Sequence, residues 1–198
     1  MKVIGITGGS GSGKSTVASL LSQITSAYII NADKIGHDIL KKGKAAYYPI
    51  VEKFGKSILN SDGEINRSKL GKIVFSNKNL LKTLNEITHP LIVQEILDII
   101  NEIKTNTNSY KYIVIDAALL IESGLHEVVD EIWLVYADED IRVNRIVERD
   151  GITKEEAKQR INSQMLWEEL KKYGDIIIDN GKDKEFTNEQ INNIVWTR

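Results

Sequence analysis

A short run near the start of the chain has the residue types and spacing that polyphosphate binding requires. Glycines let the backbone wrap closely around phosphates, and the amide N–H groups at the start of a following helix face the anion. Lys14 would reach the β- and γ-phosphates, and the Ser15 hydroxyl would bind Mg²⁺. The run matches G-x-x-x-x-G-K-[ST] in full, which favours a nucleotide site over an ordinary glycine-rich turn. Contacts to ATP are predicted at Gly8, Gly11, Ser12, Gly13, Lys14, Ser15 and Thr16.

Two aspartates stand where carboxylates could join this chemistry. Asp116 ends a strongly apolar run, and beside the first strand it could hold Mg²⁺ through water; the alternative is an aspartate that begins a turn. Asp33 follows another short run, where it could accept the proton of an attacking hydroxyl or orient that hydroxyl. Its alternative is a helix N-cap. His37 lies four residues later and would share a helical face with Asp33; the alternative is a plain surface histidine.

Cationic side chains recur later in the chain. Transfer of a phosphoryl group requires positive charge on its oxygens, and Arg142, Arg145 and Arg149 lie at helical spacing. We predict that Arg145 and Arg149 belong to a lid over ATP, whereas Arg142 is interpreted as part of a solvated helix face. Arg160 and Gln164 form a second pair one helical turn apart.

Short apolar runs supply the strands that must position these groups. Three of them, VIGIT, YIVID and IWLVY, are nearly all apolar, as strands buried on both faces of a parallel sheet require. Strands are expected at Lys2–Thr7, Ala27–Asn31, Tyr110–Asp116, Glu131–Tyr136 and Asp175–Asp179.

Helical stripes and capping signals alternate with these strands. One stripe contains Val17, Leu20, Leu21 and Ile24, and another contains Ile92, Ile96, Ile99, Ile100 and Ile103. The segments Thr153–Glu156 and Thr187–Gln190 both match the capping box, so a helix is predicted to begin at each.

The alternation predicts an α/β fold with three layers, in which helices flank a five-stranded parallel sheet. The core is expected at residues 1–31, 110–139 and 173–198. Residues 32–109 are far longer than one crossover needs, so we predict a helical insertion there, which could carry substrate contacts or move as a lid. Residues 140–172 form a second helical excursion and a candidate lid.

Composition excludes several other classes of protein. The 198 residues contain no cysteine, which excludes disulfides and thiolate metal sites, and 41% hydrophobic with 27% charged residues is typical of a globular protein. A net charge of −2 without a long basic run gives no sign of nucleic-acid binding. No apolar segment is long enough to cross a membrane. We therefore expect a cytoplasmic protein, whose oligomeric state the sequence leaves open.

The phosphate-binding run alone does not choose between GTPases, motor ATPases and small-molecule kinases. Asp33-Lys-Ile-Gly36 fits the D-x-x-G of a GTPase, but Asn77-Lys-Asn-Leu80 lacks the aspartate of a guanine-reading N-K-x-D. A motor ATPase would place a second acid beside Asp116, where Ala117 stands. These absences favour a kinase that transfers the γ-phosphoryl group of ATP to a small-molecule hydroxyl.

Several segments, taken in their order along the chain, resemble the dephospho-coenzyme A kinase family. The combination covers nearly the whole chain and is more specific than any one segment. The segments are Ile4-Gly-Ile-Thr-Gly8 with the phosphate loop, Asn31-Ala-Asp33, Ile87-Thr-His89-Pro90, Asp116-Ala-Ala-Leu119-Leu120-Ile-Glu122-Ser-Gly124, Arg145-Ile-Val-Glu-Arg149-Asp150, Arg160-Ile-Asn-Ser-Gln164 and Asp175-Ile-Ile-Ile-Asp179-Asn180-Gly181.

The resemblance implies a reaction and a role for each matching residue. ATP with Mg²⁺ would phosphorylate the ribose 3′-hydroxyl of dephospho-coenzyme A, giving coenzyme A and ADP. Asp33 would be the base or the hydroxyl-orienting group, and Lys14 and Arg145 would act with it. The acceptor would be held by Asp33, His89, Leu119, Leu120, Glu122 and Gln164, and ATP by Arg145, Arg149 and, near the adenine, Asn180.

The chain departs from the family pattern at three positions. Asn31 replaces an acid, Ala118 replaces a proline, and Arg142 stands where glutamine is expected. None of the three belongs to the phosphate cradle.

The added residues also have simpler explanations. His89 before Pro90 could mark a break in a helix, the two leucines could be core residues, and Asn180 could belong to a turn. The rival functions are another small-molecule kinase, such as a nucleoside monophosphate kinase, and a nucleotide-dependent regulatory switch.

Overall fold

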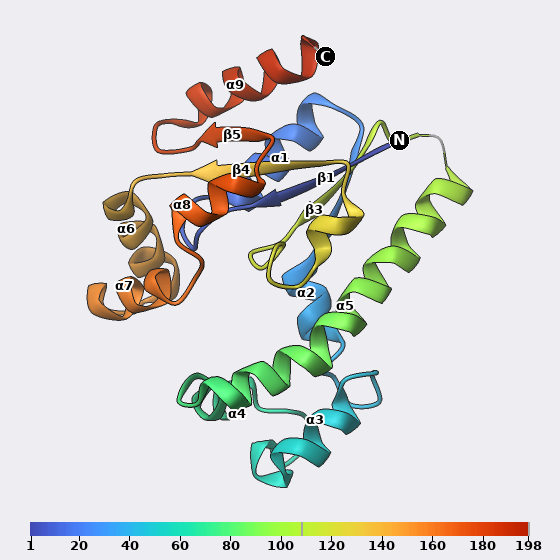
Figure 1. The fold of residues 1–198 in the computed structure, drawn as a ribbon, viewed down its shortest axis with the longest axis vertical. Helices are drawn as coiled ribbons and strands as arrows, with labels where there is room; N and C mark the ends of the chain where they lie inside the picture. Colours follow the sequence, from blue (N-terminus) through green and yellow to red (C-terminus); the bar gives the residue numbers. More distant parts are fainter. Residues whose placement is uncertain (108, 198) are drawn as a thin grey trace. The chain divides into compact units, whose positions relative to one another are not determined.

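The structure, a computed structural model, describes residues 1–107 and 109–197. Asn108, inside the predicted insertion, and Arg198, at the end of the predicted core, lie outside the described residues. The chain divides into two compact units (Figure 1): the first joins Met1–Asn31 to Lys104–Arg198, and the second is Ala32–Ile103.

A five-stranded parallel sheet forms the centre of the first unit. Its order is β2-β3-β1-β4-β5, which places the first strand in the middle. In this register Ile6 of β1 lies beside Asp116 of β3, so the segment that leaves β1 emerges next to that carboxylate. The predicted α/β fold is confirmed. The strands are β1 (Lys2–Thr7), β2 (Ala27–Asn31), β3 (Tyr112–Asp116), β4 (Glu131–Tyr136) and β5 (Ile176–Asp179).

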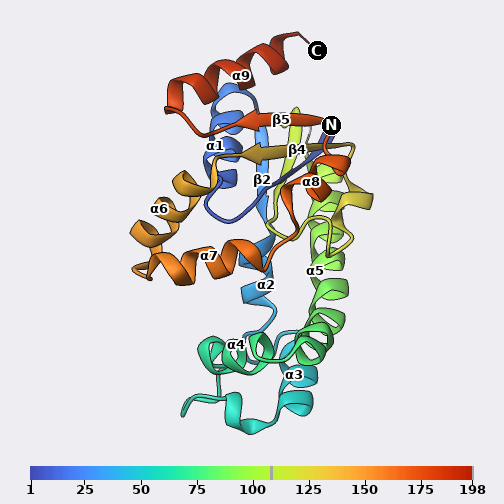
Figure 2. The ribbon, with the colours of Figure 1, turned by 60° about the vertical axis from the view of Figure 1, so that its left-hand side comes forward.

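Two helices, α1 (Lys14–Ile24) and α9 (Lys184–Trp196), pack on one face of this sheet and contact each other (Figure 2). The predicted α1 stripe is confirmed, since three of its four residues are buried and Ile24 packs against the same cluster. The core cluster contains Ile4, Ile6, Val17, Ala18, Leu20, Leu21, Ala27, Val114, Trp133, Val135, Ile178, Ile191 and Val195.

The segment after β4 forms a helical excursion. The α6 and α7 helices pack together around a small apolar cluster that includes Val143, Ile146 and Ile161. The capping box predicted at Thr153 is confirmed, because its side chain accepts from the Glu156 N–H and the Glu156 side chain accepts from the Thr153 N–H. The elements are α6 (Glu139–Asp150), α7 (Lys154–Asn162), α8 (Trp167–Leu170) and the 3₁₀ turn η3 (Lys171–Tyr173).

The capping box predicted at Thr187 is wrong. The last helix begins three residues earlier, at Lys184, because Asp183 caps it by accepting a hydrogen bond from the Phe186 N–H. Thr187 therefore lies inside α9, and Gln190 bonds the backbone of Asp179 at the end of β5.

The second unit consists of helices around its own apolar cluster. That cluster joins α2 to α4 through residues such as Ile35, Leu70 and Val74. The elements are α2 (Ala32–Asp38), α3 (Tyr47–Phe54), the 3₁₀ turn η1 (Lys56–Ile58), α4 (Arg67–Phe75) and α5 (Lys78–Asn106), whose last turn belongs to the first unit. A further 3₁₀ turn, η2 (Leu125–Val128), lies in the first unit.

The helix α5 runs for 29 residues with Pro90 inside it. The alternative that His89 marks a helix break is therefore wrong. A proline removes only its own N–H from the backbone ladder, and the helix continues on both sides. The second predicted stripe lies on α5, with Ile96, Ile100 and Ile103 buried. No helix among the described residues has the length and apolarity that crossing a bilayer needs.

Candidate active site

The phosphate loop joins the central strand to the first helix, which is the context its motif predicts. It begins after Thr7, and α1 starts at Lys14. The Ser12 N–H donates to the Gly9 carbonyl over 3.1 Å and closes a turn. The Lys14 amine donates to the Gly8 carbonyl over 3.1 Å, so the lysine folds across the loop. The strand, loop and helix together aim backbone N–H groups at one point.

Two glycines of the loop are required by neighbouring segments as well as by phosphate. Gly11 has a φ of 79°, and a Cβ there would lie 2.6 Å from the carbonyl oxygen of Arg142. Gly13, with a φ of 93°, has no room for a Cβ because the side-chain amide of Asn180 occupies that space. Both positions need the left-handed conformation that glycine adopts without strain.

The two predicted metal-linked residues contact each other. The Ser15 hydroxyl donates to Oδ2 of Asp116 over 2.6 Å, and Asp116 is only 5% exposed. A hydroxyl and a carboxylate are oxygen ligands, and Mg²⁺ is typically held by one or two such groups together with water and substrate phosphates. The pair therefore suits a magnesium site beside the phosphate loop.

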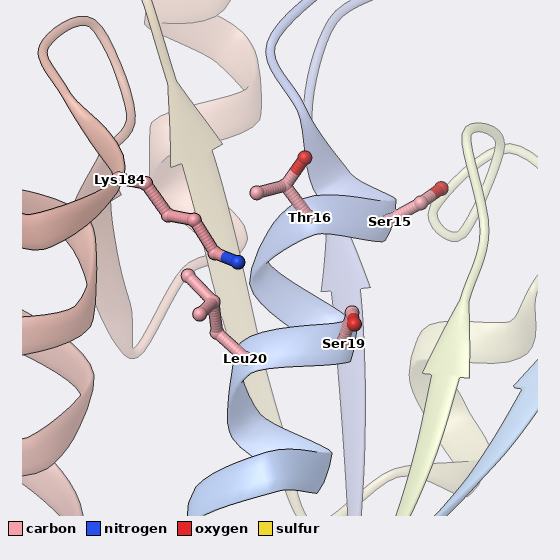
Figure 3. Close-up of a pocket in the computed structure, with 5 residues that line it drawn as sticks. All are labelled: Ser15, Thr16, Ser19, Leu20 and Lys184. Carbon is pink, nitrogen blue, oxygen red and sulfur yellow. The ribbon is translucent and has the colours of Figure 1, made fainter.

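A cavity of about 400 Å³ extends along α1 from the phosphate loop towards α9. Figure 3 shows the amine of Lys184 pointing into it from the start of α9. Ser15 and Thr16 line its loop end. Close by, among the described residues, the buried hydroxyl of Ser12 has no hydrogen-bond partner. A buried polar atom without a partner is rare and is explained by a ligand or ordered water. The reading of the sequence missed Lys184, because a lysine after a capping aspartate is a common surface pattern.

Arg142 contacts the phosphate loop, which corrects the interpretation of this residue as part of a solvated face. Its Nε donates to the Ser10 carbonyl over 2.9 Å, and burial lowers the pKa of its guanidinium. The Ser10 N–H donates to Oε1 of Gln164 over 2.6 Å. The N–H and the carbonyl of Ser10 are therefore both bonded by side chains of the 140–172 segment.

Arg145 is also directed at the loop. It donates to the carbonyls of Gly11 over 3.4 Å, Ser12 over 3.3 Å and Asn180 over 2.9 Å. These contacts tie α6, the loop and the end of β5 together. The placement leaves a guanidinium beside the phosphate cradle, where positive charge would stabilise a transferring phosphoryl group.

Arg149 and Arg160 make a different set of contacts. Both donate to the carboxylate of Asp150, and these hydrogen bonds, first that of Arg149, lower the pKa of Asp150 to about 2. Arg149 bonds a neighbour on its own helix, α6, whereas Arg160 joins the end of α7 to α6. Arg160 and Gln164, paired by spacing in the sequence, contact different partners. The role of Arg149 in ATP binding stays a prediction.

Asn180 is buried beside the loop. Its Nδ2 donates to the Ser12 carbonyl over 2.7 Å, and its Oδ1 accepts from the Thr187 hydroxyl over 2.9 Å. The Thr187 side chain thus fixes the orientation of the amide, a role that the reading of the sequence missed because it treated Thr187 as a cap. Proximity of Asn180 to adenine stays a prediction.

An aromatic contact connects β4 to the segment that follows the lid helices. The ring of Tyr136, the last residue of β4, lies 4.9 Å from the ring of Trp167, measured between centroids. The Tyr136 hydroxyl donates to Asp138 Oδ1 over 2.5 Å. Trp167 begins α8, so the contact joins a residue just before the 140–172 segment to a residue near the end of that segment.

The residues assigned to the acceptor lie in both units. In the first unit Leu120 is fully buried against Gly5 of β1, which confirms the core alternative for this leucine, whereas Leu119 is 40% exposed and Glu122 is exposed. In the second unit Asp33 is exposed inside the first turn of α2 rather than at its cap. His89 is half-buried in the middle of α5. Their contacts with a substrate stay predictions.

Comparisons with known proteins agree on one family. The model of the "Dephospho-CoA kinase" family matches residues 2–185. A dephospho-CoA kinase of Carboxydothermus hydrogenoformans is 46% identical over 96% of this chain and 91% of that protein. Among solved structures, a dephospho-CoA kinase from Campylobacter jejuni is 29% identical with a TM-score of 0.69 over 98% of this chain and 95% of that one. The protein TT1252 from Thermus thermophilus is 25% identical with a TM-score of 0.80, covering 99% and 97% of the two chains.

Proposed function

The chain belongs to the dephospho-CoA kinase family, and from that premise we propose how its residues carry out the reaction. The enzyme transfers a phosphoryl group from ATP to the ribose 3′-hydroxyl of dephospho-CoA, which is the last step of CoA biosynthesis. The observation that carries the mechanism is the complete phosphate loop with the Ser15–Asp116 pair at its helix end.

On the nucleotide side, the loop binds the phosphates of ATP through the N–H groups of residues 11–16. Lys14 leaves the Gly8 carbonyl and contacts the β- and γ-phosphates, where its charge offsets the negative charge that develops on transfer. Ser15 and, through water, Asp116 would hold Mg²⁺. The metal, when bound, neutralises charge on the phosphates.

On the acceptor side, Asp33 orients the attacking hydroxyl or accepts its proton. Support comes from its chemistry and its position: it is an exposed carboxylate two residues beyond the end of β2. The acceptor is also contacted by the residues that the family resemblance assigns to it, namely His89, Leu119, Glu122 and Gln164. A carboxylate base contributes roughly 10²- to 10⁴-fold to a reaction of this kind.

The 140–172 segment acts as a lid. Arg145 contributes charge to the γ-phosphoryl group, and Arg149 contacts ATP once it leaves Asp150. A closed lid excludes water and so limits hydrolysis of ATP. The second unit serves as the acceptor domain. We also place the enzyme in the cytoplasm, where its donor ATP and Mg²⁺ are both present.

One assay tests the function directly. Release of ADP is measured with purified dephospho-CoA as the sole acceptor. Separate reactions contain AMP, UMP or dTMP as the acceptor instead. We expect ADP release only with dephospho-CoA, and loss of that release when EDTA removes Mg²⁺. Faster release with a nucleoside monophosphate would contradict the assignment, as would ADP release that needs no acceptor.

A further inference from the structure

A guanidinium on α4 contacts an imidazole on α2 in the second unit. Nη2 of Arg67 lies 2.5 Å from Nε2 of His37. Arginine is always charged and can only donate, so His37 accepts this hydrogen bond as the neutral imidazole. Burial lowers the pKa of His37, and the charge of Arg67 lowers it further, while Asp33 and Asp38 act in the opposite direction. Among residues 1–107 and 109–197, no carboxylate forms an ion pair with Arg67, so this contact leaves its positive charge available to an anion.

The frame that holds this pair is rigid. Both helices, α2 and α4, pack on the apolar cluster of the second unit, α2 through Ile35 and α4 through Leu70 and Val74. Arg67 is the first residue of α4, and the side chain of the preceding Asn66 caps the helix by accepting from the Lys69 N–H. The position of Arg67 is thus set by a cap and a core, even though its side chain lies at the surface.

The pair lies one helical turn from the proposed hydroxyl-orienting carboxylate. Asp33 and His37 are four residues apart on α2, which puts them on one face with a rise of about 6 Å. The charge of Asp33 acts on His37, which agrees with this placement. In a nucleotide, the 3′-hydroxyl and the 5′-phosphate lie on opposite sides of one sugar ring, so a similar short span separates them.

From this juxtaposition we propose that Arg67, presented by His37, binds the diphosphate on the 5′ side of the acceptor while Asp33 faces its 3′-hydroxyl. The inference rests on the proposed function, because it takes Asp33 as the hydroxyl-orienting group. Guanidinium matches phosphate oxygens with two parallel N–H donors. His37 acts as a positioning residue that keeps the guanidinium on the α2 face. Acceptors without a 5′-phosphate would lack this contact.

The test measures the KM for dephospho-CoA and the KM for ATP in four proteins: the wild type, Arg67→Gln, Arg67→Lys and Lys72→Gln. Lys72 is an exposed cation on the same helix and serves as the matched control. We expect Arg67→Gln to raise the KM for dephospho-CoA about 10- to 100-fold, the size of a lost charge-assisted contact. Its KM for ATP should stay within about twofold, because the ATP residues lie in the other unit.

The remaining outcomes decide the inference. Arg67→Lys should recover part of the loss, since it keeps the charge but not the fork, and Lys72→Gln should behave as the wild type. A KM for dephospho-CoA within about twofold of wild type in Arg67→Gln would overturn the proposal. The proposal would also be overturned if Arg67→Gln and Arg67→Lys raised the KM for dephospho-CoA equally and both lowered the melting temperature. A wild type that releases no ADP with dephospho-CoA would instead contradict the proposed function.

Discussion

The phosphate-loop region and the second unit hold their functional residues by different means. Around the loop, hydrogen bonds join residues that lie more than 100 positions apart, such as Ser10 to Arg142 and Ser15 to Asp116. In the second unit, Asp33, His37 and Arg67 lie within 35 positions of one another on short helices packed around a local apolar cluster. In our proposal, nucleotide binding therefore depends on contacts across the first unit, whereas the part of acceptor recognition assigned to Asp33 and Arg67 depends on a separately packed unit.

The largest effect that this comparison predicts belongs to Lys14. The Lys14→Ala variant should lose both ATP affinity and turnover, with kcat/KM for ATP falling on the order of 10³-fold, because the phosphates lose their main cation. Steady-state kinetics with ATP and calorimetric ATP titration measure the two components. Since the second unit is intact, a fluorescent or tritiated dephospho-CoA should still bind. Normal ATP affinity in this variant would break the assignment of the loop.

A substitution of Asp33 should lower turnover without changing the affinity for ATP, in contrast to the substitution of Lys14. In Asp33→Asn, kcat should fall by roughly 10²-fold or more, the usual size of acid–base help, while ATP affinity stays unchanged. Single-turnover kinetics together with ATP titration separate these quantities. Unchanged turnover would show that Asp33 neither orients the attacking hydroxyl nor accepts its proton. The second unit would then only bind substrate.

A substitution of Arg142 tests whether its hydrogen bond to the Ser10 carbonyl supports ATP binding. Removal of its guanidinium in Arg142→Gln should raise the KM for ATP about 10-fold, because a hydrogen bond that fixes the loop is lost. Lys158, an exposed cation on α7, is the matched control, and Lys158→Gln should leave this KM unchanged. Equal effects of the two substitutions would mean that lid charge, rather than the contact with Ser10, supports ATP binding.

The smallest effect concerns the network of Asp150 with Arg149 and Arg160. Asp150→Asn should lower the free energy of unfolding by about 0.2–1 kcal/mol, as for other exposed ion pairs. The folded-state pKa of about 2 lies below the ordinary value of 3.8. The stabilisation is therefore present above about pH 4 and disappears as the pH falls towards 2. Denaturant unfolding of both proteins from pH 2 to 7 checks this, and a constant difference across that range would contradict it.

The sequence predicted the elements that depend on local patterns. The strand, loop and helix around Lys14 follow from a motif with fixed spacing, and the capping box at Thr153 is a contact within four residues. The prediction that Asp116 lies beside the first strand also follows from such a pattern, and the structure adds its contact with Ser15.

The errors concern contacts that local patterns do not determine. Helical spacing placed Arg142 on a stripe with Arg145 and Arg149, but spacing does not say which part of that stripe faces the loop. At Thr187 the sequence matches a capping pattern, but the helix is capped by Asp183, four residues earlier. Arg67 carried no motif, and only the packing of α2 against α4 brings it to His37.

The contact between Tyr136 and Trp167 gives the enzyme an optical reporter of the 140–172 segment, which we propose to be a lid. Of the other two tryptophans, Trp133 is 2% exposed in the core and Trp196 is 77% exposed near the end of the chain. The indole of Trp167 is the one placed where the 140–172 segment returns to the sheet. Any rearrangement of that segment changes the distance between two aromatic rings, and hence the fluorescence emission, without a dye or an added label.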